Sequence, residues 1–356
     1  MDICIRTQRR GADGWGHLVR TATLARYLEE MLPCSRVVVM GEFDKVAEGF
    51  LRRRVRRLCL LPEGVSPRHE LEFWPLPRRP SLVVLDMPYC AADRQLVWKA
   101  SGAVTWLLDE YGEQTHRSDV VVCAPWLSAG HEYRLRDEVQ YLRGIEYMVV
   151  DPAFRHARHA TQRQPGPARN VVVMLGLRIT PATYGAVADG VSRIPGLVPT
   201  YLLHQDTDEE QLDALRPYMN DARVVLGTDC VADYMATADF AFMSAGHAKY
   251  EAACAGLPMA LIAADEGQAA VAEAFALAGA ADYLGMQRHV DAERIADYGR
   301  HVLFDGWYLQ QMGQVGMDLV DGHGVDRLFE HLQEWLLQPG GDHVRSLLDE
   351  AAKSRH

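Results

Sequence analysis

The sequence lacks the features that mark several specialised classes of protein. Its seven cysteines are scattered singly, with no Cys-x-x-Cys pair and no His-x-x-x-His partner, so neither a disulfide scaffold nor a zinc site is expected. No apolar run reaches the ~18 residues that a membrane span requires, and the N-terminus lacks the apolar stretch of a signal peptide. These absences predict a cytoplasmic protein with buried, reduced cysteines and no metal or cofactor.

Positive charge is also scarce. Lysine and arginine total 37 against 48 aspartate and glutamate residues, which gives a formal charge of −11. Nucleic acids and anionic membranes bind basic surfaces, so neither is expected as a partner. The remaining composition, 48% apolar and 24% charged, is that of an ordinary folded protein, and 356 residues are enough for two domains.

Short β-branched runs alternate with longer helical patterns along the chain. Strands are expected at 3–6, 36–40, 82–85, 104–108, 120–123 and 147–150, and again at 171–176, 200–203, 223–226, 240–243 and 259–262. Helices are expected between them, among them 17–31, 43–54, 93–100 and one that begins with Thr180 as N-cap and Pro181 at its first position. This alternation predicts parallel βαβ units in two doubly wound α/β domains.

A polar segment that contains Pro165 and Pro167 divides the two halves of the chain. We interpret residues 156–170 as a linker between an N-terminal domain, 1–155, and a C-terminal domain, 171–338, which a tail at 339–356 follows. In doubly wound folds, ligands bind at the carboxyl ends of the strands. The cleft between the domains is therefore the predicted site.

The first candidate for chemistry is a glycine-rich segment, 11–20 (GADGWGHLVR), directly after the first strand. Gly14 and Gly16 let the backbone approach a ligand closely, and the start of the following helix favours negative charge. His17 stands at that helix start, where the dipole favours a neutral imidazole that can accept a proton. A histidine that merely caps the helix fits the spacing equally well.

The second candidate is the segment 244–251 (SAGHAKYE), which follows a strand of the second half. Small residues up to Gly246 expose backbone N–H groups at a helix start, which suits a phosphate. Glu251 lies further into that helix, where a carboxylate can accept hydrogen bonds from two ribose hydroxyls. The alternative for Glu251 is a solvent-facing residue of a packing helix.

Two aspartates form a third feature, since Asp86 follows LVVL and Asp109 follows VTWLL. Carboxylates at strand ends can bind sugar hydroxyls or act as acids and bases, although they also commonly cap the next helix. The arginines within 52–57 are interpreted as a solvated helix end, where cations suit the dipole. His116, His131, His156 and His159 show no metal-ligand spacing with carboxylates or cysteines.

At this point the motifs resemble a known family. GWGHLVRTATLA (14–25) is similar to the Gly-x-Gly-His-x-x-Arg-x-x-x-Leu-Ala signature of the PseG family of UDP-sugar hydrolases, with its spore-coat polysaccharide and MurG-type glycosyltransferase relatives. Further blocks resemble the family in the same order: VVLDMPY (83–89), LLDEYGEQTHRSDVVV (107–122), YLRGIEYMVVDPAF (141–154), SAGHAKYEAACAGLPMALI (244–262) and MGQVGMDLVDGHGVDRL (312–328). The resemblance covers nearly the whole chain. It implies a GT-B fold of two facing Rossmann-like domains.

The resemblance also implies roles for individual residues. His17 matches the base that activates water, Glu251 matches the carboxylate that binds the ribose hydroxyls of UDP, and Gln268 matches a glutamine near the donor. Asp86 and Asp109 are grouped with His17 as catalytic candidates. The candidates for nucleotide or phosphate binding are Gly14, Gly16, Arg20, Gly176, Arg178, Gly246, His247, Lys249, Glu251 and Gln268.

The phosphate loops depart from the family pattern. Gly176 is followed by Leu177, Arg178 and Ile179 instead of Gly-Ser-Asp, and His247 and Ala248 replace small hydroxyl residues. Hydroxyl donors are lost, while Arg178, His247 and Lys249 could supply charged ones. The substrate implied is thus a nucleotide-activated small molecule linked to UDP or, compatibly with fewer phosphate contacts, to CMP.

The resulting hypothesis is a hydrolase of a nucleotide-activated sugar, in which His17 activates water and the nucleotide is released. A GT-B glycosyltransferase that transfers the sugar to an acceptor is the first alternative. A catalytically idle nucleotide-binding protein is the second. In so acidic a chain, positive potential must be concentrated locally, and it is expected at the helix starts and at Arg20, Arg178 and Lys249.

Overall fold

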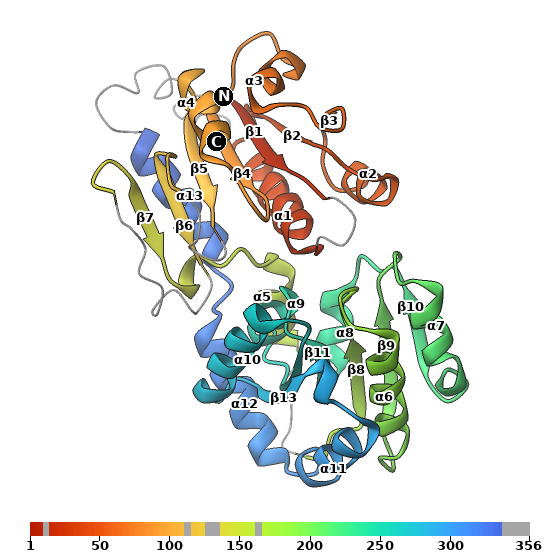
Figure 1. Cartoon of the computed structure of the whole chain (residues 1–356). Coiled ribbons are helices and arrows are strands. Elements are labelled where there is room, and N and C mark those ends of the chain that lie inside the picture. Colours follow the sequence, from red (N-terminus) through yellow and green to blue (C-terminus); the bar gives the residue numbers. More distant parts are fainter. Residues whose placement is uncertain (10–13, 110–114, 125–135, 161–165, 337–356) are drawn as a thin grey trace. The chain divides into compact units, whose positions relative to one another are not determined.

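The chain forms two α/β units, each built on a parallel β-sheet (Figure 1). The computed structural model describes residues 1–9, 14–109, 115–124, 136–160 and 166–336. The first unit comprises Met1–Val149 together with the chain from His323 onward, and the second comprises Val150–Gly322. Both units have the predicted doubly wound α/β architecture.

The sheet of the first unit has the strand order β3-β2-β1-β4-β5-β6-β7, with every pair parallel. Its strands are β1 (Asp2–Thr7), β2 (Arg36–Gly41), β3 (Leu58–Leu60), β4 (Leu82–Asp86), β5 (Val104–Leu108), β6 (Val120–Cys123) and β7 (Gln140–Arg143). β1 pairs with β2 on one side, Ile3 opposite Val37, and with β4 on the other, Ile3 opposite Leu82. The strand order therefore reverses between β1 and β4, and ligands of such sheets bind at that switch point.

Helices cover both faces of this sheet. They are α1 (Gly16–Met31), α2 (Lys45–Arg52), α3 (Pro67–Glu70), α4 (Ala92–Ala100) and α13 (Gly324–Leu336). Because side chains alternate along a strand, Ile3 and Ile5 of β1 join one apolar cluster with α1 and α13, while Cys4 joins another with Trp98 of α4. Burial of β1 on both faces explains why Ile3, Cys4 and Ile5 are consecutive apolar residues, with Arg6 buried directly after them.

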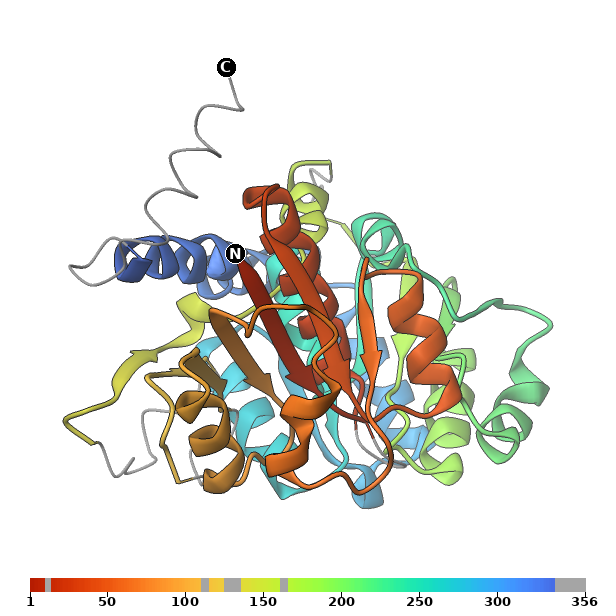
Figure 2. The same cartoon turned by 90° about the horizontal axis from the view of Figure 1, so that it is seen from above.

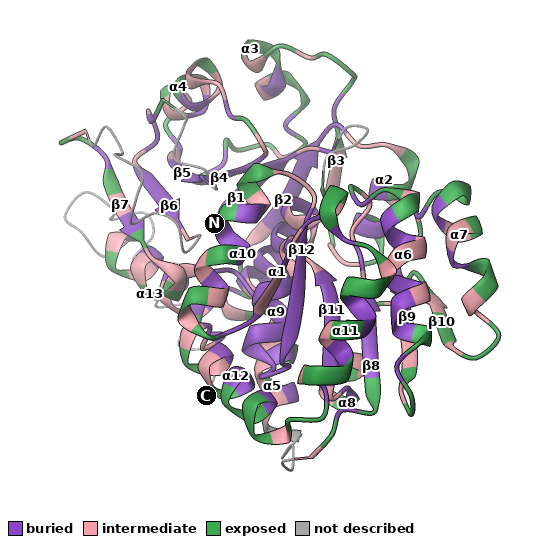
Figure 3. Cartoon of the chain, turned by 60° about the horizontal axis from the view of Figure 1, so that its bottom comes forward, coloured by how far each residue is buried: buried purple, intermediate pink, exposed green. Residues whose placement is uncertain are grey.

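The sheet of the second unit has the order β10-β9-β8-β11-β12-β13 and is also parallel. Its strands are β8 (Asn170–Met174), β9 (Val198–Leu203), β10 (Arg223–Leu226), β11 (Phe240–Ser244), β12 (Met259–Ala263) and β13 (Asp282–Met286). The central strands β8, β11 and β12 are largely buried (Figure 3). Here the order reverses between β8 and β11.

Eight helices belong to the described part of the second unit. They are α5 (Pro152–Ala160), α6 (Pro181–Ser192), α7 (Glu209–Leu215), α8 (Val231–Thr237), α9 (Ala248–Cys254), α10 (Glu266–Ala278), α11 (Ala292–Val302) and α12 (Gly306–Leu319). The predicted start of α6 is confirmed, since the Thr180 hydroxyl accepts a hydrogen bond from the Thr183 N–H and Pro181 is the first helical residue. The predicted strands of this unit are also confirmed, with bounds shifted by up to two residues.

One predicted strand is wrong, and three observed strands were not predicted. Residues 147–150 form no strand; instead a short 3-10 helix spans Ile145–Tyr147 after Gly144, whose φ is 123°. The edge strand β7 lies seven residues earlier, and its sequence QYLR, with exposed residues at both ends, gives no continuous apolar run. The short β3 and the edge strand β13 were likewise not predicted, because tertiary pairing rather than composition makes them strands.

The domain boundary also differs from the predicted one. The chain enters the second unit at Val150, and residues 156–160 of the predicted linker belong to α5, which packs on α8 and α9. It returns to the first unit at His323, because Leu328, Phe329 and Leu332 of α13 bury their side chains in the cluster around α1. In Figure 2, α13 is the blue helix beside the N-terminus. The rest of the linker up to 165 and the tail at 339–356 lie outside the described residues.

Cysteine burial follows the prediction only in part. Cys4, Cys90, Cys123 and Cys254 are buried, but Cys34 and Cys230 are exposed, since they stand in turns rather than in the apolar strands. No disulfide joins these residues, all of which are described. Within the described ranges, no helix is both long and apolar enough to cross a membrane, and no three His, Cys, Asp or Glu residues cluster as metal ligands would.

Candidate functional site

The switch point of the first unit brings His17 and Asp86 together. β1 leads through the glycine-rich segment into α1, and His17 is the second residue of that helix. Asp86 is the last residue of the neighbouring strand β4. Because β1 and β4 are parallel neighbours, both residues reach the same carboxyl edge of the sheet, although 69 residues separate them.

Their geometry is that of a buried acid–base pair. His17 Nδ1 lies 2.6 Å from Asp86 Oδ1, and Arg20, one helical turn after His17, donates from Nε to Oδ2 at 3.0 Å and from Nη2 to Oδ1 at 2.6 Å. The three residues are between 1% and 7% exposed. Arg20 Nη2 also lies 2.9 Å from His17 Nδ1, because both donors converge on Oδ1.

Electrostatics keep Asp86 ionised. Burial alone would raise the pKa of this carboxyl group, but the positive charge of Arg20, together with His17, outweighs burial and brings the pKa well below its usual value. An ionised Asp86 accepts a hydrogen bond from the Nδ1–H group of His17 and so fixes the orientation of the imidazole ring. Nε2 is then the nitrogen that can accept a proton, as in other histidine–carboxylate pairs.

Asp109 lies at the same edge, directly after β5. Its Oδ2 is 2.8 Å from Nε2 of His116, and His116 Nδ1 is 3.2 Å from the hydroxyl of Tyr141. Asp109 and His116 are buried. Asp109 and Arg20 line one small hollow, so the sequence-predicted catalytic residues do gather in one region. His116, for which the sequence suggested no role, lies with them. The only feature of the sequence that could have indicated it is its position as a polar residue shortly before the buried strand β6.

Gly14 and Gly16 stand at the start of α1, and their predicted approach to a ligand stays a prediction. Gly14 is exposed with open space around it, and Gly16 begins α1. No acidic residue stands in the first turn of α1, and the side chain of its N-cap residue, Trp15, makes no capping hydrogen bond. Gly11 of the same segment lies outside the described residues. The Arg20 guanidinium binds Asp86 through Nε and Nη2, and its predicted contact with a phosphate stays a prediction.

In the second unit, too, residues at the ends of two neighbouring strands meet at the point where the strand order reverses. Gly176 follows β8 and Ser244 ends the neighbouring β11. The Gly176 N–H donates to the Ser244 hydroxyl at 3.0 Å, and a Cβ at Gly176 would stand 2.9 Å from that oxygen. A side chain at position 176 would therefore displace the Ser244 hydroxyl where the two strand ends approach.

Lys249 points into its own loop, and its predicted contact with a phosphate stays a prediction. Its side chain is buried, and Nζ donates to the carbonyls of Ala245 and Gly246 at 3.1 and 3.0 Å and lies 4.0 Å from the ring centre of Tyr250. The ammonium thus stabilises the loop that contains Gly246. His247, at the start of α9, packs its ring against Tyr250. Burial favours these inward contacts over solvent exposure, which sequence spacing cannot reveal.

Glu251 is 6% exposed, so its interpretation as a solvent-facing residue is wrong. Burial, reinforced by the negative charge of Asp151, raises its pKa to about 8. No side-chain hydrogen bond or ion pair connects Glu251 to the rest of the described chain. A buried carboxyl group of this kind is stabilised by a ligand that donates hydrogen bonds to it.

Arg178 is ion-paired with Asp265 at 2.6 Å, and Asp265 also caps α10 by accepting from the Gln268 N–H. The Gln268 side chain accepts from the Ala264 N–H at 3.0 Å, so its carbonyl oxygen is committed to the loop. Gln287, which sequence analysis missed, ties these loops together: it accepts from the Thr180 N–H and donates to the carbonyls of Ala264 and Arg178. No sequence signal marks it.

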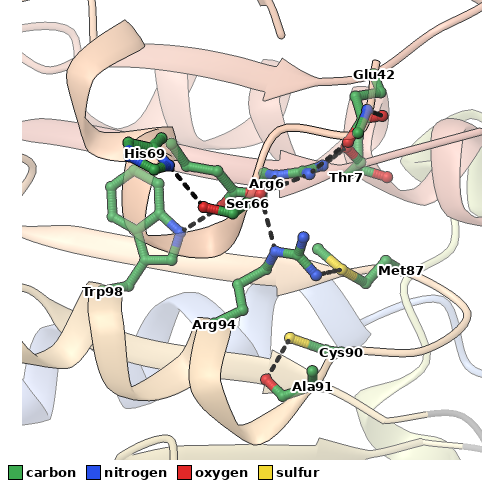
Figure 4. Close-up of polar contacts among 12 residues, drawn as sticks. Arg6, Thr7, Glu42, Ser66, His69, Met87, Cys90, Ala91, Arg94 and Trp98 are labelled. Carbon is green, nitrogen blue, oxygen red and sulfur yellow. Dashed lines mark hydrogen bonds and ion pairs between the residues drawn. The ribbon is translucent and has the colours of Figure 1, made fainter. Parts of the chain in front are cut away.

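A buried charged network beneath the first switch point was also missed. Arg6 of β1 donates twice to Glu70 of α3, at 3.0 and 2.8 Å, and Arg94 donates to the same oxygen at 2.9 Å (Figure 4). The Trp98 indole N–H donates to the other oxygen of Glu70 at 3.1 Å. The network joins β1, α3 and α4 and so fixes the strand that leads to His17. The one feature of the sequence that could have indicated this network is Arg6, a charged residue directly after the apolar residues of β1.

Comparisons with known proteins agree with this architecture. No family model matches the sequence. The chain is 23% identical over 332 residues to the spore coat polysaccharide biosynthesis protein SpsG of Bacillus subtilis, covering 90% of this chain and 94% of that protein. The predicted resemblance to spore-coat polysaccharide proteins is thereby confirmed.

Solved structures share the fold over nearly the whole chain. MurG of Acinetobacter baumannii has a TM-score of 0.64 at 13% identity, covering 94% of this chain and 99% of its own. MnaA of S. aureus, solved with UDP, has 0.65 at 11% (94% and 96%), and the calicheamicin glycosyltransferase CalG4 has 0.59 at 12% (94% and 98%). The predicted GT-B fold, with two Rossmann-like units, is confirmed. The narrower likeness to PseG hydrolases stays a prediction.

Proposed function

We propose that this protein is an enzyme that acts on a nucleotide-activated sugar and transfers the sugar to a hydroxyl group that His17 deprotonates. The observation that carries the proposal is the buried set His17, Asp86 and Arg20 at the switch point of the first sheet. A carboxylate kept ionised by an arginine and bound to a histidine is costly to bury. If His17 accepts a proton during the reaction, the presence of this buried set at a ligand-binding edge of the sheet is explained.

The proposed reaction assigns each group a step. His17 Nε2 takes the proton of the attacking hydroxyl, whose oxygen forms a bond to the anomeric carbon of the sugar. The bond from that carbon to the phosphate oxygen breaks, and its electron pair leaves with the nucleotide. Asp86 stabilises the imidazolium that forms, and a positioned base of this kind typically contributes about 10²- to 10⁴-fold in rate.

The second unit is proposed to bind the nucleotide. Glu251 supplies a buried carboxyl group for the two ribose hydroxyls, as its match to the MurG-like pattern implies. Gly176 and Gly246 present backbone at the carboxyl edge of the sheet, where phosphates are commonly bound. A phosphate that approaches Arg178 would exchange with Asp265 as the partner of its guanidinium.

The comparisons support transfer. SpsG is named for polysaccharide biosynthesis, MnaA binds UDP, and CalG4 is a glycosyltransferase. Hydrolysis, with water in place of the acceptor hydroxyl, is the second candidate function, because the His17 segment is the block that resembles the PseG signature most fully. The same histidine serves both reactions, so the attacking hydroxyl alone distinguishes them.

A single assay series separates these functions. The full chain is incubated with UDP-, GDP- and CMP-sugars, with and without a panel of carbohydrate acceptors, and release of the nucleotide is measured. Release that requires an acceptor supports transfer, and release without one supports hydrolysis. If calorimetry shows that a nucleotide sugar binds but no mixture releases the nucleotide, the protein is a nucleotide-binding protein without catalytic activity, and the proposal is overturned.

A further inference from the structure

An arginine-rich hollow lies on the first unit, away from the residues described above. It is formed by the second half of α1 and by the turn that follows α2, both labelled in Figure 1. Its volume is about 440 Å³. We call it the arginine hollow, and its charged lining residues are Arg26, Glu29, Glu30, Arg53, Arg54 and Arg56. Arg26 is nine residues after His17 on α1, which at 1.5 Å per residue places it about 13 Å further along the helix.

The hollow is positive although the whole chain is strongly acidic. Four arginines face two glutamates in its lining, and Arg26, Arg53 and Arg56 are exposed. Arg54 is held in place, since its guanidinium lies 3.8 Å from the ring centre of Phe50 and donates to the Phe50 carbonyl. Positive charges around a concave surface focus positive potential, which favours a bound anion.

Glu29 gives the hollow a second kind of group. Its side chain is nine-tenths buried, and Oε1 accepts no hydrogen bond from any described residue. The ion pairs of Glu29 with Arg56 and Arg57 are long, at 3.4 and 3.7 Å. Burial raises the pKa of Glu29 against the influence of those arginines. An unsatisfied, buried acceptor beside guanidinium groups is matched by a ligand that carries a hydroxyl or amino donor next to an anionic group.

We propose that the arginine hollow binds a sugar phosphate. The phosphate contacts Arg53 and Arg56, which suit its geometry, and a neighbouring sugar hydroxyl donates to Glu29 Oε1. The volume is within the range of small-ligand sites, whereas a polymer or a membrane surface would need a flat or extended basic face. This site is independent of the nucleotide-sugar function proposed above and requires no turnover for its test.

Hydrogen exchange of the full chain with glucose 6-phosphate as probe tests the site directly. At constant ionic strength, we expect protection of residues 26–30 and 52–57 at millimolar probe, weaker protection by inorganic phosphate and none by glucose. Equal protection by sulfate would reduce the effect to charge screening and overturn the proposal. Protection by phosphatidylserine vesicles but not by glucose 6-phosphate would overturn it in favour of a membrane surface.

Matched variants assign the contacts. Arg53→Ala with Arg56→Ala should weaken glucose 6-phosphate binding at least about tenfold, as expected when charge-assisted hydrogen bonds are lost. Arg216→Ala with Arg300→Ala removes the same charge from exposed positions of the second unit and should leave binding unchanged. Arg26→Ala, on the exposed face of α1, repeats the test if the first pair fails to fold. Unchanged binding in a folded hollow variant overturns the proposal.

Glu29→Gln tests the hydroxyl contact separately. It should leave inorganic phosphate binding intact or slightly stronger, because a negative charge is removed, yet lower the preference for glucose 6-phosphate over phosphate about threefold or more. An unchanged preference would show that only the anion is recognised and would overturn the assignment of a sugar phosphate.

Discussion

His17 Nδ1 lies 2.6 Å from Asp86 Oδ1, across the point where the strand order of the first sheet reverses. Arg20 completes the pair by donating to both oxygens of the carboxylate. This set of three residues is the element of the structure with the most direct chemical meaning. Its role in catalysis and its role in stability can be separated by substitution.

Replacement of His17 by alanine should abolish turnover while nucleotide binding persists. The variant removes the proton acceptor and leaves the second unit, with Glu251, unaltered. We expect the turnover number to fall by about 10²- to 10⁴-fold. Nucleotide release and calorimetric binding, measured on the same preparation, check both parts, and full activity of the variant would refute the assignment.

Asp86→Asn should destabilise the first unit, because Arg20 then stays buried without its anionic partner. A broken buried pair typically costs about 3–5 kcal/mol. The double variant Arg20→Met with Asp86→Leu removes both charges and should recover much of that stability without recovering activity. Denaturant unfolding gives the free energies. Equal losses in the single and double variants would show that packing, not the uncompensated charge, decides the cost.

Glu251 predicts a pH-dependent affinity. Its pKa in the folded protein is raised to about 8, so below that pH the carboxyl group is mostly protonated. Two ribose hydroxyls donate best to the ionised form. Affinity for the nucleotide should therefore rise about tenfold for each pH unit up to pH 8 and level off above it. Calorimetry from pH 6 to 9 checks this, and Glu251→Gln should bind more weakly with little pH dependence.

The same residue predicts a stability effect with a definite sign. A carboxyl group whose pKa is higher in the folded state favours folding at low pH, and this contribution is lost as the pH rises from about 4.5 to about 8. Glu251→Gln removes the titrating group. The free energy of unfolding of the unliganded variant should thus exceed that of the wild type above pH 8 by several kcal/mol, with a smaller difference at pH 5.

His116 is predicted to position Asp109. His116→Ala should lower the turnover number about tenfold with little change in nucleotide affinity, because it removes the contact from His116 Nε2 that helps to orient the Asp109 carboxylate toward the hollow that it shares with Arg20. His116→Gln, which can place a nitrogen near the same oxygen, should recover part of the loss. Tyr141→Phe serves as a control that keeps the ring beside His116. A purely structural role would lower stability in His116→Ala without changing the turnover of the folded fraction.

Much of this protein could be predicted from its sequence because local patterns carried the information. The alternation of β-branched runs and helical segments is a property of neighbouring residues, so the doubly wound class and most strands were predicted correctly. The glycine-rich segment before His17 and the position of Glu251 shortly after a strand are also patterns of neighbouring residues, so the sequence alone reveals them. Once parallel βαβ units are assumed, such residues necessarily lie at the carboxyl edges of sheets.

Only the tertiary structure decided which groups meet. Strand order, which depends on packing over long chain separations, placed Asp86 beside His17 and the arginines after α2 beside the second half of α1. It also returned α13 to the first unit and turned Lys249 inward to the carbonyls of its own loop. Local sequence patterns determine in which helix, strand or loop a side chain stands. Which distant residues it contacts depends on burial and on the free energy gained when buried charges are paired.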